Sequence, residues 1–148
     1  MKIGIVGAGF VCDYYLSTLP MHPELHVVGI TDQIAERSDK VGRHYGVPRF
    51  DSVDSLLRNA DVELVLNLTN PRDHYGVSTA ALAAGKHVYS EKPLAMDAAE
   101  AEAVFAEAER HGVKVVEAFM YRTHPTWREV KRLVDAGEIG PLRHVQTF

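Results

Sequence analysis

Residues 2–12 read KIGIVGAGFVC, a short apolar run followed at once by a glycine-rich turn. The first five have the length and the isoleucine and valine content typical of a strand buried on both faces. Gly7 and Gly9 then stand where this strand would pass into a helix, which is the context of the dinucleotide fingerprint G-x-G-x-x-G. The first glycine permits the tight turn, the second lets the backbone approach a pyrophosphate, and the phosphates meet the positive end of the helix. Cys12 takes the third small position, and a plain turn between strand and helix remains the alternative.

Further short apolar runs alternate with helical patterns along the chain. The apolar runs after the first are Leu25 to Ile30, Val62 to Leu68, Lys86 to Tyr89 and Lys114 to Val116. The helical patterns span Arg37 to Tyr45, Ser52 to Asn59, Arg72 to Ala84, and Asp97 to His111, where Asp97 is expected to cap the helix. Strands joined repeatedly by crossover helices predict an α/β fold, a doubly wound and mostly parallel sheet of the Rossmann type.

Composition excludes several classes of protein. The 148 residues carry 16 Lys and Arg against 20 Asp and Glu, a formal net charge of −4. A nucleic-acid binder would need clustered basic residues, which are absent from this sequence. The single cysteine excludes an intramolecular disulfide and a CxxC site, and we predict no metal site. No apolar stretch approaches the roughly 20 residues of a membrane helix, so we expect a soluble, cytoplasmic protein.

Asp32 ends the second expected strand, 23 residues after Gly9. An acidic side chain at this position can accept hydrogen bonds from the adenosine ribose. Its charge would repel a 2′-phosphate, which favours NAD over NADP, although Arg37 would weaken that preference. The alternative is that Asp32 caps the following helix, and one residue can do both.

Polar residues follow two more of the expected strands. Ligands of open α/β sheets bind beyond the carboxyl ends of the strands, which places Thr69, Asn70 and His74 near a ligand. Glu91 and Lys92 follow the next strand, where Lys92 can donate a hydrogen bond to a substrate oxygen and help to move a proton. Without further information, the simpler explanations are favoured: a helix cap for Thr69 or Asn70, a surface position for His74, and an exposed Lys–Glu pair before a helix.

The last part of the sequence breaks the alternation. After an expected helix from about Pro125 to Asp135, a turn signal runs through Gly137 and Pro141, and Leu142 to Phe148 alternates like a strand. A single strand cannot bury its own face. We therefore expect a dinucleotide-binding domain over residues 1–140 and, over residues 141–148, the start of a substrate and oligomerisation domain that is otherwise absent.

The order of these motifs resembles the amino-terminal domain of the Gfo/Idh/MocA family of nicotinamide-dependent oxidoreductases. The resemblance covers nearly the whole chain, and its most specific part is Ala84-Gly85-Lys86-His87-Val88-x-x-Glu91-Lys92-Pro93-Leu94-Ala95. It implies that Gly7, Gly9 and Asp32, with Phe10 and Val11 of the same loop, hold the dinucleotide. It further implies that Thr69, Asn70 and His74 border the nicotinamide, that Glu91 and Lys92 face the reacting centre, and that Arg122 lies near the cofactor. The chain departs from the family pattern at Cys12 and at Asn70, where many members carry proline.

The resemblance implies an oxidoreductase domain that binds NAD, with NADP as the second choice. Hydride would move between the nicotinamide and a hydroxyl-bearing carbon of a sugar, polyol or diol, with Lys92 as the catalytic residue. Full-length members continue into a second domain that completes the substrate pocket and forms homo-oligomers, so we expect this chain alone to bind dinucleotide with little or no turnover. One alternative is a dinucleotide-binding module without turnover, and a weaker one is a Rossmann-like domain for another nucleotide.

Overall fold

The computed structural model describes residues 1–146, and the chain falls into two compact units, Met1–Ala118 and Phe119–Phe148. The first unit is built on five parallel strands in the spatial order β2-β1-β3-β4-β5. Their bounds are Lys2–Val6 (β1), His26–Thr31 (β2), Leu64–Asn67 (β3), His87–Ser90 (β4) and Val115–Glu117 (β5). The parallel α/β sheet predicted from sequence is confirmed.

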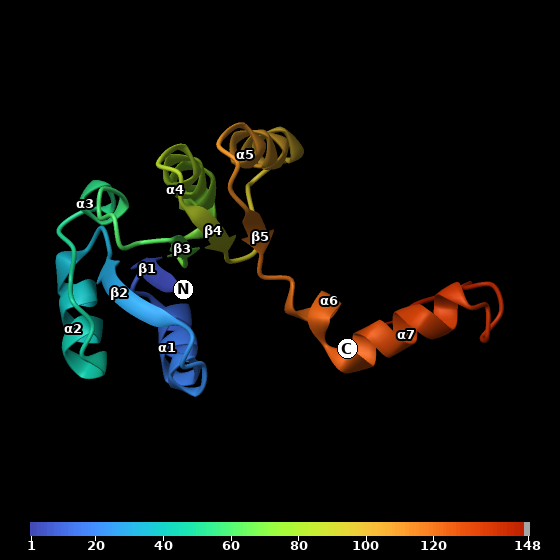
Figure 1. Cartoon of the computed structure of the whole chain (residues 1–148). Coiled ribbons are helices and arrows are strands. Elements are labelled where there is room, and N and C mark those ends of the chain that lie inside the picture. Colours follow the sequence, from blue (N-terminus) through green and yellow to red (C-terminus); the bar gives the residue numbers. More distant parts are fainter. Residues whose placement is uncertain (147–148) are drawn as a thin grey trace. The chain divides into compact units, whose positions relative to one another are not determined.

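Helices cover both faces of this sheet (Figure 1). On one face lie α1 (Phe10–Thr18), which runs into a short 3-10 turn at Leu19–Met21, and α2 (Ala35–Tyr45). On the other face lie α3 (Val53–Leu57), α4 (Pro71–Ala83) and α5 (Ala98–Arg110). The Asp97 side chain accepts a hydrogen bond from the backbone N–H of Glu100, which confirms the predicted cap of α5. The fold is therefore a three-layer sandwich with the strands in the middle.

Each face of the sheet has its own apolar core. The core under α1 and α2 contains Ile3, Ile5, Cys12, Leu16, Ile30 and Leu66. The core under α3, α4 and α5 contains Val6, Leu56, Val65, Leu82, Val88 and Val104. Cys12 is fully buried, and this burial raises the pKa of its thiol to about 12. The thiol at the third small position thus packs as an apolar group between helix and strand.

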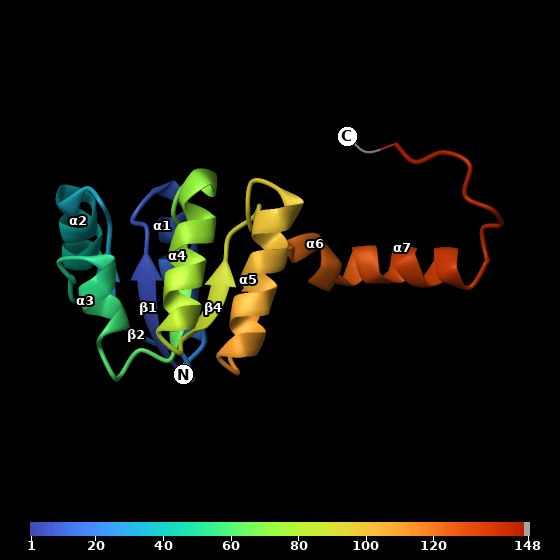
Figure 2. The same ribbon diagram turned by 90° about the horizontal axis from the view of Figure 1, so that it is seen from above.

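The strands end in register, which creates one functional edge. Val6 pairs with both Thr31 and Asn67, Asn67 pairs with Ser90, and Ser90 pairs with Glu117. Each of these residues is the last of its strand. Figure 2 shows the arrowheads of β1 and β4 pointing to this shared edge. The residues that follow the strands, from Gly7 to Glu91, are therefore brought together although they lie far apart in the sequence.

The second unit contains the short helix α6 (Met120–Thr123) and the helix α7 (Pro125–Asp135), which matches the predicted bounds. Leu142 to Gln146 form no strand, because pairing needs a neighbouring strand and the described part of this unit has none. The rest of the strand predicted to Phe148 lies outside the described residues. Within residues 1–146, no helix combines the length and the apolar character needed to cross a membrane.

Candidate functional site

The turn after β1 has the geometry of the glycine fingerprint. Gly7 has a φ of 103°, and a Cβ at this position would lie 2.5 Å from the carbonyl group of Leu68, so only glycine fits. At Gly9, by contrast, a Cβ would meet no atom within 4 Å. Gly9 is also the cap residue of α1. Because glycine has no side chain, no side chain at this position caps the first backbone amides of the helix. The turn therefore offers open space beside a helix amino terminus, where a pyrophosphate fits.

Asp32 joins this turn to the segment that leads into α2. Its Oδ2 accepts a hydrogen bond from the backbone N–H of Ala8 at 2.7 Å, and its Oδ1 accepts one from Ile34 at 2.8 Å. The residue at the cap position of α2 is Ile34, so Asp32 is not the helix cap that the sequence offered as an alternative. Each carboxylate oxygen can accept a further hydrogen bond, which leaves Asp32 able to bind ribose hydroxyls.

A cavity of about 350 Å³ opens directly on these residues. Its volume lies in the range of small-ligand sites. Of the predicted site residues, Gly7, Gly9, Asp32, Thr69 and Asn70 line it, together with Arg37. A neighbouring hollow of about 650 Å³ shares Gly9, Arg37 and Asn70 with this cavity and is also lined by Phe10. The structure thus brings five of the predicted residues, from three different strand ends, onto one cavity.

The loop after β3 is fixed by Asn67, a residue that was not selected from the sequence. The Asn67 side chain is fully buried, and its Nδ2 donates to the carbonyl oxygen of His74 and to Oγ of Ser78, both at 3.0 Å. Its Oδ1 accepts from Oγ1 of Thr69 at 2.7 Å. The Asn67 side-chain amide therefore hydrogen-bonds to residues on both sides of Asn70, and it holds this loop against α4. The only signal in the sequence is a polar residue at the end of an apolar run.

His74 lies inside the protein rather than on its surface. Its side chain is 1% exposed, and its two ring nitrogens lie within hydrogen-bonding distance of the carbonyl oxygens of Pro93 and Thr69. The imidazole therefore bridges the loop after β3 and the loop after β4. Asn70 occupies the cap position of α4, but its side chain makes no capping hydrogen bond, so capping does not explain it.

The loop after β4 is held from several directions. The Glu91 backbone N–H donates to the carbonyl oxygen of Asn67 at 2.9 Å, and the Leu94 N–H donates to Oε1 of Glu117 at 2.9 Å. Oε1 of Glu91 accepts from the Tyr15 hydroxyl at 2.8 Å, and its Oε2 accepts from the Lys92 N–H at 3.1 Å. The peptide bond between Lys92 and Pro93 is cis. Tyr15 and Glu117 are contacts that local sequence patterns did not reveal.

Lys92 itself is exposed at this fixed loop. Within the described residues, no carboxylate oxygen lies within 4.0 Å of its Nζ, so the exposed Lys–Glu ion pair offered as an alternative does not form.

Val11 is 37% exposed on α1, beside the fingerprint turn. Arg122 belongs to the second unit, where its guanidinium carbon lies 5.0 Å from the centre of the Phe119 ring, and its place near the cofactor stays a prediction. Within residues 1–146, no group of three or more His, Cys, Asp or Glu side chains is arranged to hold a metal ion.

Comparison with known proteins supports a dinucleotide site. The model of a family described as an oxidoreductase family with an NAD-binding Rossmann fold matches residues 1–119. The chain is 33% identical over 144 residues to inositol 2-dehydrogenase of Salmonella paratyphi B, covering 95% of this chain and 43% of the relative. It is 32% identical over 142 residues to trans-1,2-dihydrobenzene-1,2-diol dehydrogenase of Oryctolagus cuniculus, covering 94% of this chain and 43% of the relative.

A similar solved structure is that of KijD10, a 3-ketoreductase from Actinomadura kijaniata, in complex with TDP-benzene and NADP in an open conformation. The TM-score is 0.87 at 31% identity, and the match covers 97% of this chain and 46% of KijD10. The chain thus spans less than half the length of these relatives.

Proposed function

Since the chain belongs to the Gfo/Idh/MocA family of oxidoreductases, as an NAD-binding Rossmann domain, we propose that it holds the cofactor for hydride transfer to or from a hydroxyl-bearing carbon. The substrate is a sugar, polyol or related diol, the kind of compound named for the inositol and dihydrobenzenediol dehydrogenases. The observation that carries the proposal is the cavity onto which the Gly7–Gly9 turn, Asp32 and the loop after β3 all open.

The parts of the cofactor are assigned by the chemistry of each wall. The open space at Gly9 and the amino terminus of α1, with Phe10 and Val11, receive the pyrophosphate. Asp32 accepts hydrogen bonds from the adenosine ribose. The loop carrying Thr69 and Asn70, held in place by His74, borders the nicotinamide half. Arg122 is a further cofactor residue that the family resemblance implies.

The bound nicotinamide supplies the hydride acceptor or donor, and the protein supplies orientation and proton transfer. Lys92 stands on a loop fixed by backbone hydrogen bonds at Glu91 and Leu94, so its position is set before substrate binds. In the direction of reduction, the Lys92 ammonium donates a hydrogen bond to the substrate carbonyl oxygen and passes a proton to it as the alcohol forms. In the reverse direction, Nζ takes up the proton of the hydroxyl group.

NAD is the preferred cofactor and NADP the second choice. The Asp32 carboxylate lies at the ribose end of the cavity, where its charge would repel a 2′-phosphate. Arg37 lines the same cavity and reduces that repulsion. KijD10 was solved with NADP, so members of this fold accept the phosphate as well.

We infer that turnover requires more chain than these 148 residues. Residues 1–140 form the dinucleotide-binding domain, and residues 141–148 begin a domain that closes the substrate pocket and forms a homo-oligomer. The coverage of less than half of each relative supports this division. The same observation favours a second candidate for the chain by itself, a dinucleotide-binding module without turnover. The cytoplasmic location stays a prediction.

Titration with NADH, followed by nicotinamide fluorescence, tests the cofactor site. In a Gly9→Val variant the new side chain fills the open space beside α1, so NADH binding should be lost while the fold persists. Ala99→Val adds similar bulk on the exposed surface of α5 and should bind NADH normally. Equal binding by all three proteins would place the cofactor elsewhere and overturn the proposal.

A further inference from the structure

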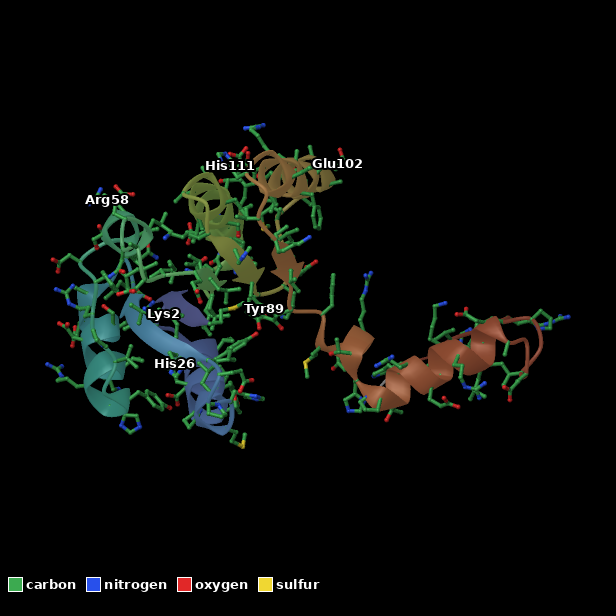
Figure 3. All side chains as sticks on the ribbon, viewed as in Figure 1. Lys2, His26, Arg58, Tyr89, Glu102 and His111 are labelled. Atoms are coloured by element: carbon green, nitrogen blue, oxygen red, sulfur yellow. The ribbon has the colours of Figure 1, made fainter. Side chains whose placement is uncertain are left out.

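The hydroxyl group of Tyr15 connects two segments that lie 76 residues apart. Tyr15 lies on α1, and its hydroxyl donates to Oε1 of Glu91 at 2.8 Å. Its ring meets the ring of Tyr89 edge to face, with the ring centres 6.3 Å apart. Figure 3 labels Tyr89, which projects from β4 toward the face of the sheet that α1 covers. The helix that opens the cofactor site is thus linked to the loop that carries Lys92.

Tyr15 keeps its proton and remains a donor. Burial, and then the hydrogen bond to the Glu91 carboxylate, raise the pKa of the Tyr15 hydroxyl far above its usual value. The partly buried contact is also an interaction with a charged acceptor, the stronger class of hydrogen bond. Glu91 is therefore held by a partner that does not titrate in the working range of an enzyme.

Each oxygen of the Glu91 carboxylate accepts one hydrogen bond, and together the two bonds orient the group. Oε1 accepts from Tyr15, and Oε2 accepts from the backbone N–H of Lys92. Glu91 directly precedes Lys92 in the chain, yet the carboxylate and the ammonium group do not form an ion pair. The hydroxyl of Tyr15 gives the Glu91 carboxylate a partner on α1.

We propose that Tyr15 is a positioning residue that holds the Glu91 carboxylate on α1 and thereby leaves the Lys92 ammonium free for a substrate oxygen. The part concerning substrate rests on the proposed function. The geometric part concerns only the chain itself, so it can be tested without cofactor or turnover.

The test measures the acetylation rate of each lysine by acetic anhydride, read by mass spectrometry of peptides from the intact chain without dinucleotide. Two lysines serve as internal references. Lys2 is paired with Asp61, which raises the pKa of its amine, whereas Lys40 is exposed on α2 without an ion-pair partner among the described residues. In the unaltered chain, Lys92 should react at the rate of Lys40 and faster than Lys2. A rate as slow as that of Lys2 would overturn the proposal before any variant is made.

Tyr15→Phe removes one hydroxyl and keeps the ring that packs on Tyr89. Glu91 is then free to pair with Lys92, and acetylation of Lys92 should slow by about two- to fourfold, the scale of one exposed ion pair. In the double variant Tyr15→Phe/Glu91→Gln no charge is left to pair, and the rate should return to that of the unaltered chain. Merely loosening the loop would not slow an amine that is already exposed.

An unchanged rate in Tyr15→Phe, or a slow rate that persists in the double variant, would overturn the proposal. The rate of Lys40 should stay constant throughout and reports any general change in the fold. Failure of NADH to bind would count against the proposed function and would leave these acetylation rates untouched, so the two ideas fail separately.

Discussion

The edge of the sheet where the strands end and the second unit differ in how deeply their polar and apolar side chains are buried. At the edge, Asn67, His74, Ser78 and Ser90 are at most 1% exposed. Within the described residues, no buried side-chain nitrogen or oxygen lacks a hydrogen-bond partner. In the second unit, α6 and α7 contain no buried residue, and the ion pairs of Arg132 with Glu129 and Glu138 are exposed. A satisfied buried network fixes one loop geometry, whereas exposed ion pairs contribute little to stability.

The apolar residues show the same contrast. The two cores of the first unit are complete within residues 1–118. In the second unit, large apolar side chains are 42–64% exposed, namely Trp127, Val130, Ile139, Leu142 and Val145. They line one hollow of about 1060 Å³ with Tyr121 and Val134. The first unit therefore carries a fully formed cavity, while the second exposes an apolar surface of the kind that marks an interaction site.

The largest effect should come from Lys92, whose ammonium group forms no ion pair among the described residues. In a full-length version, Lys92→Met should lower turnover by about 10²-fold or more while NAD affinity stays within a few-fold, because proton-transfer and orienting groups contribute on that scale. Lys114→Met, at an exposed position before β5, is the matched control and should retain activity. Near-normal turnover of the Lys92 variant would make the residue structural, and a loss confined to cofactor affinity would assign it to nicotinamide positioning.

The next effect should be on stability and tests the buried network itself. Asn67→Leu removes the hydrogen-bond partners of Ser78, Thr69 and the His74 carbonyl group. Leaving buried polar groups unsatisfied should lower the free energy of unfolding by about 2–3 kcal/mol, measured by urea denaturation. Arg132→Ala breaks exposed ion pairs in the second unit and should cause no measurable change. If the two variants lost the same free energy of unfolding, the buried network at the sheet edge would contribute no more to stability than the exposed ion pairs of the second unit.

The sequence predicted the parts of the edge that depend on local patterns. The apolar runs, the glycines at Gly7 and Gly9, and Asp32 are each recognisable within a few residues, because turn geometry and strand burial are local constraints. The buried hydrogen bonds of Tyr15 and His74 were not recognisable. Their partners lie 76 and 19 residues away and become neighbours only when the strand ends align. A histidine in the first turn of a helix looks like a surface residue until the loop after β4 folds over it.

A smaller effect should separate the two cofactors. Asp32→Ala removes the charge that opposes a 2′-phosphate, so the ratio of NADPH to NADH dissociation constants should fall by about tenfold, the equivalent of about 1.4 kcal/mol. Part of the change should appear as weaker NADH binding, since the carboxylate also holds the fingerprint turn through Ala8. Nicotinamide fluorescence titrations of both cofactors provide the ratio. Tighter NADPH than NADH binding in the unaltered chain would already contradict the role given to Asp32.

The smallest change in stability and in NADH affinity is expected when the second unit is removed. A chain that stops after Ala118 keeps all buried members of both apolar cores, the strand pairing and every residue that lines the 350 Å³ cavity. Its free energy of unfolding should therefore stay within about 0.5 kcal/mol of that of the 148-residue chain, the range of changes remote from a core. Its NADH affinity should also be nearly unchanged, unless Arg122 adds the cofactor contact implied by the family resemblance. Urea denaturation and NADH titration of the two chains measure both quantities. A large loss of stability would show that the first unit does not fold stably by itself. A loss of NADH affinity at constant stability would instead point to a contact from residues 119–148. If Arg122→Ala in the 148-residue chain reproduced that loss, Arg122 would be the contact.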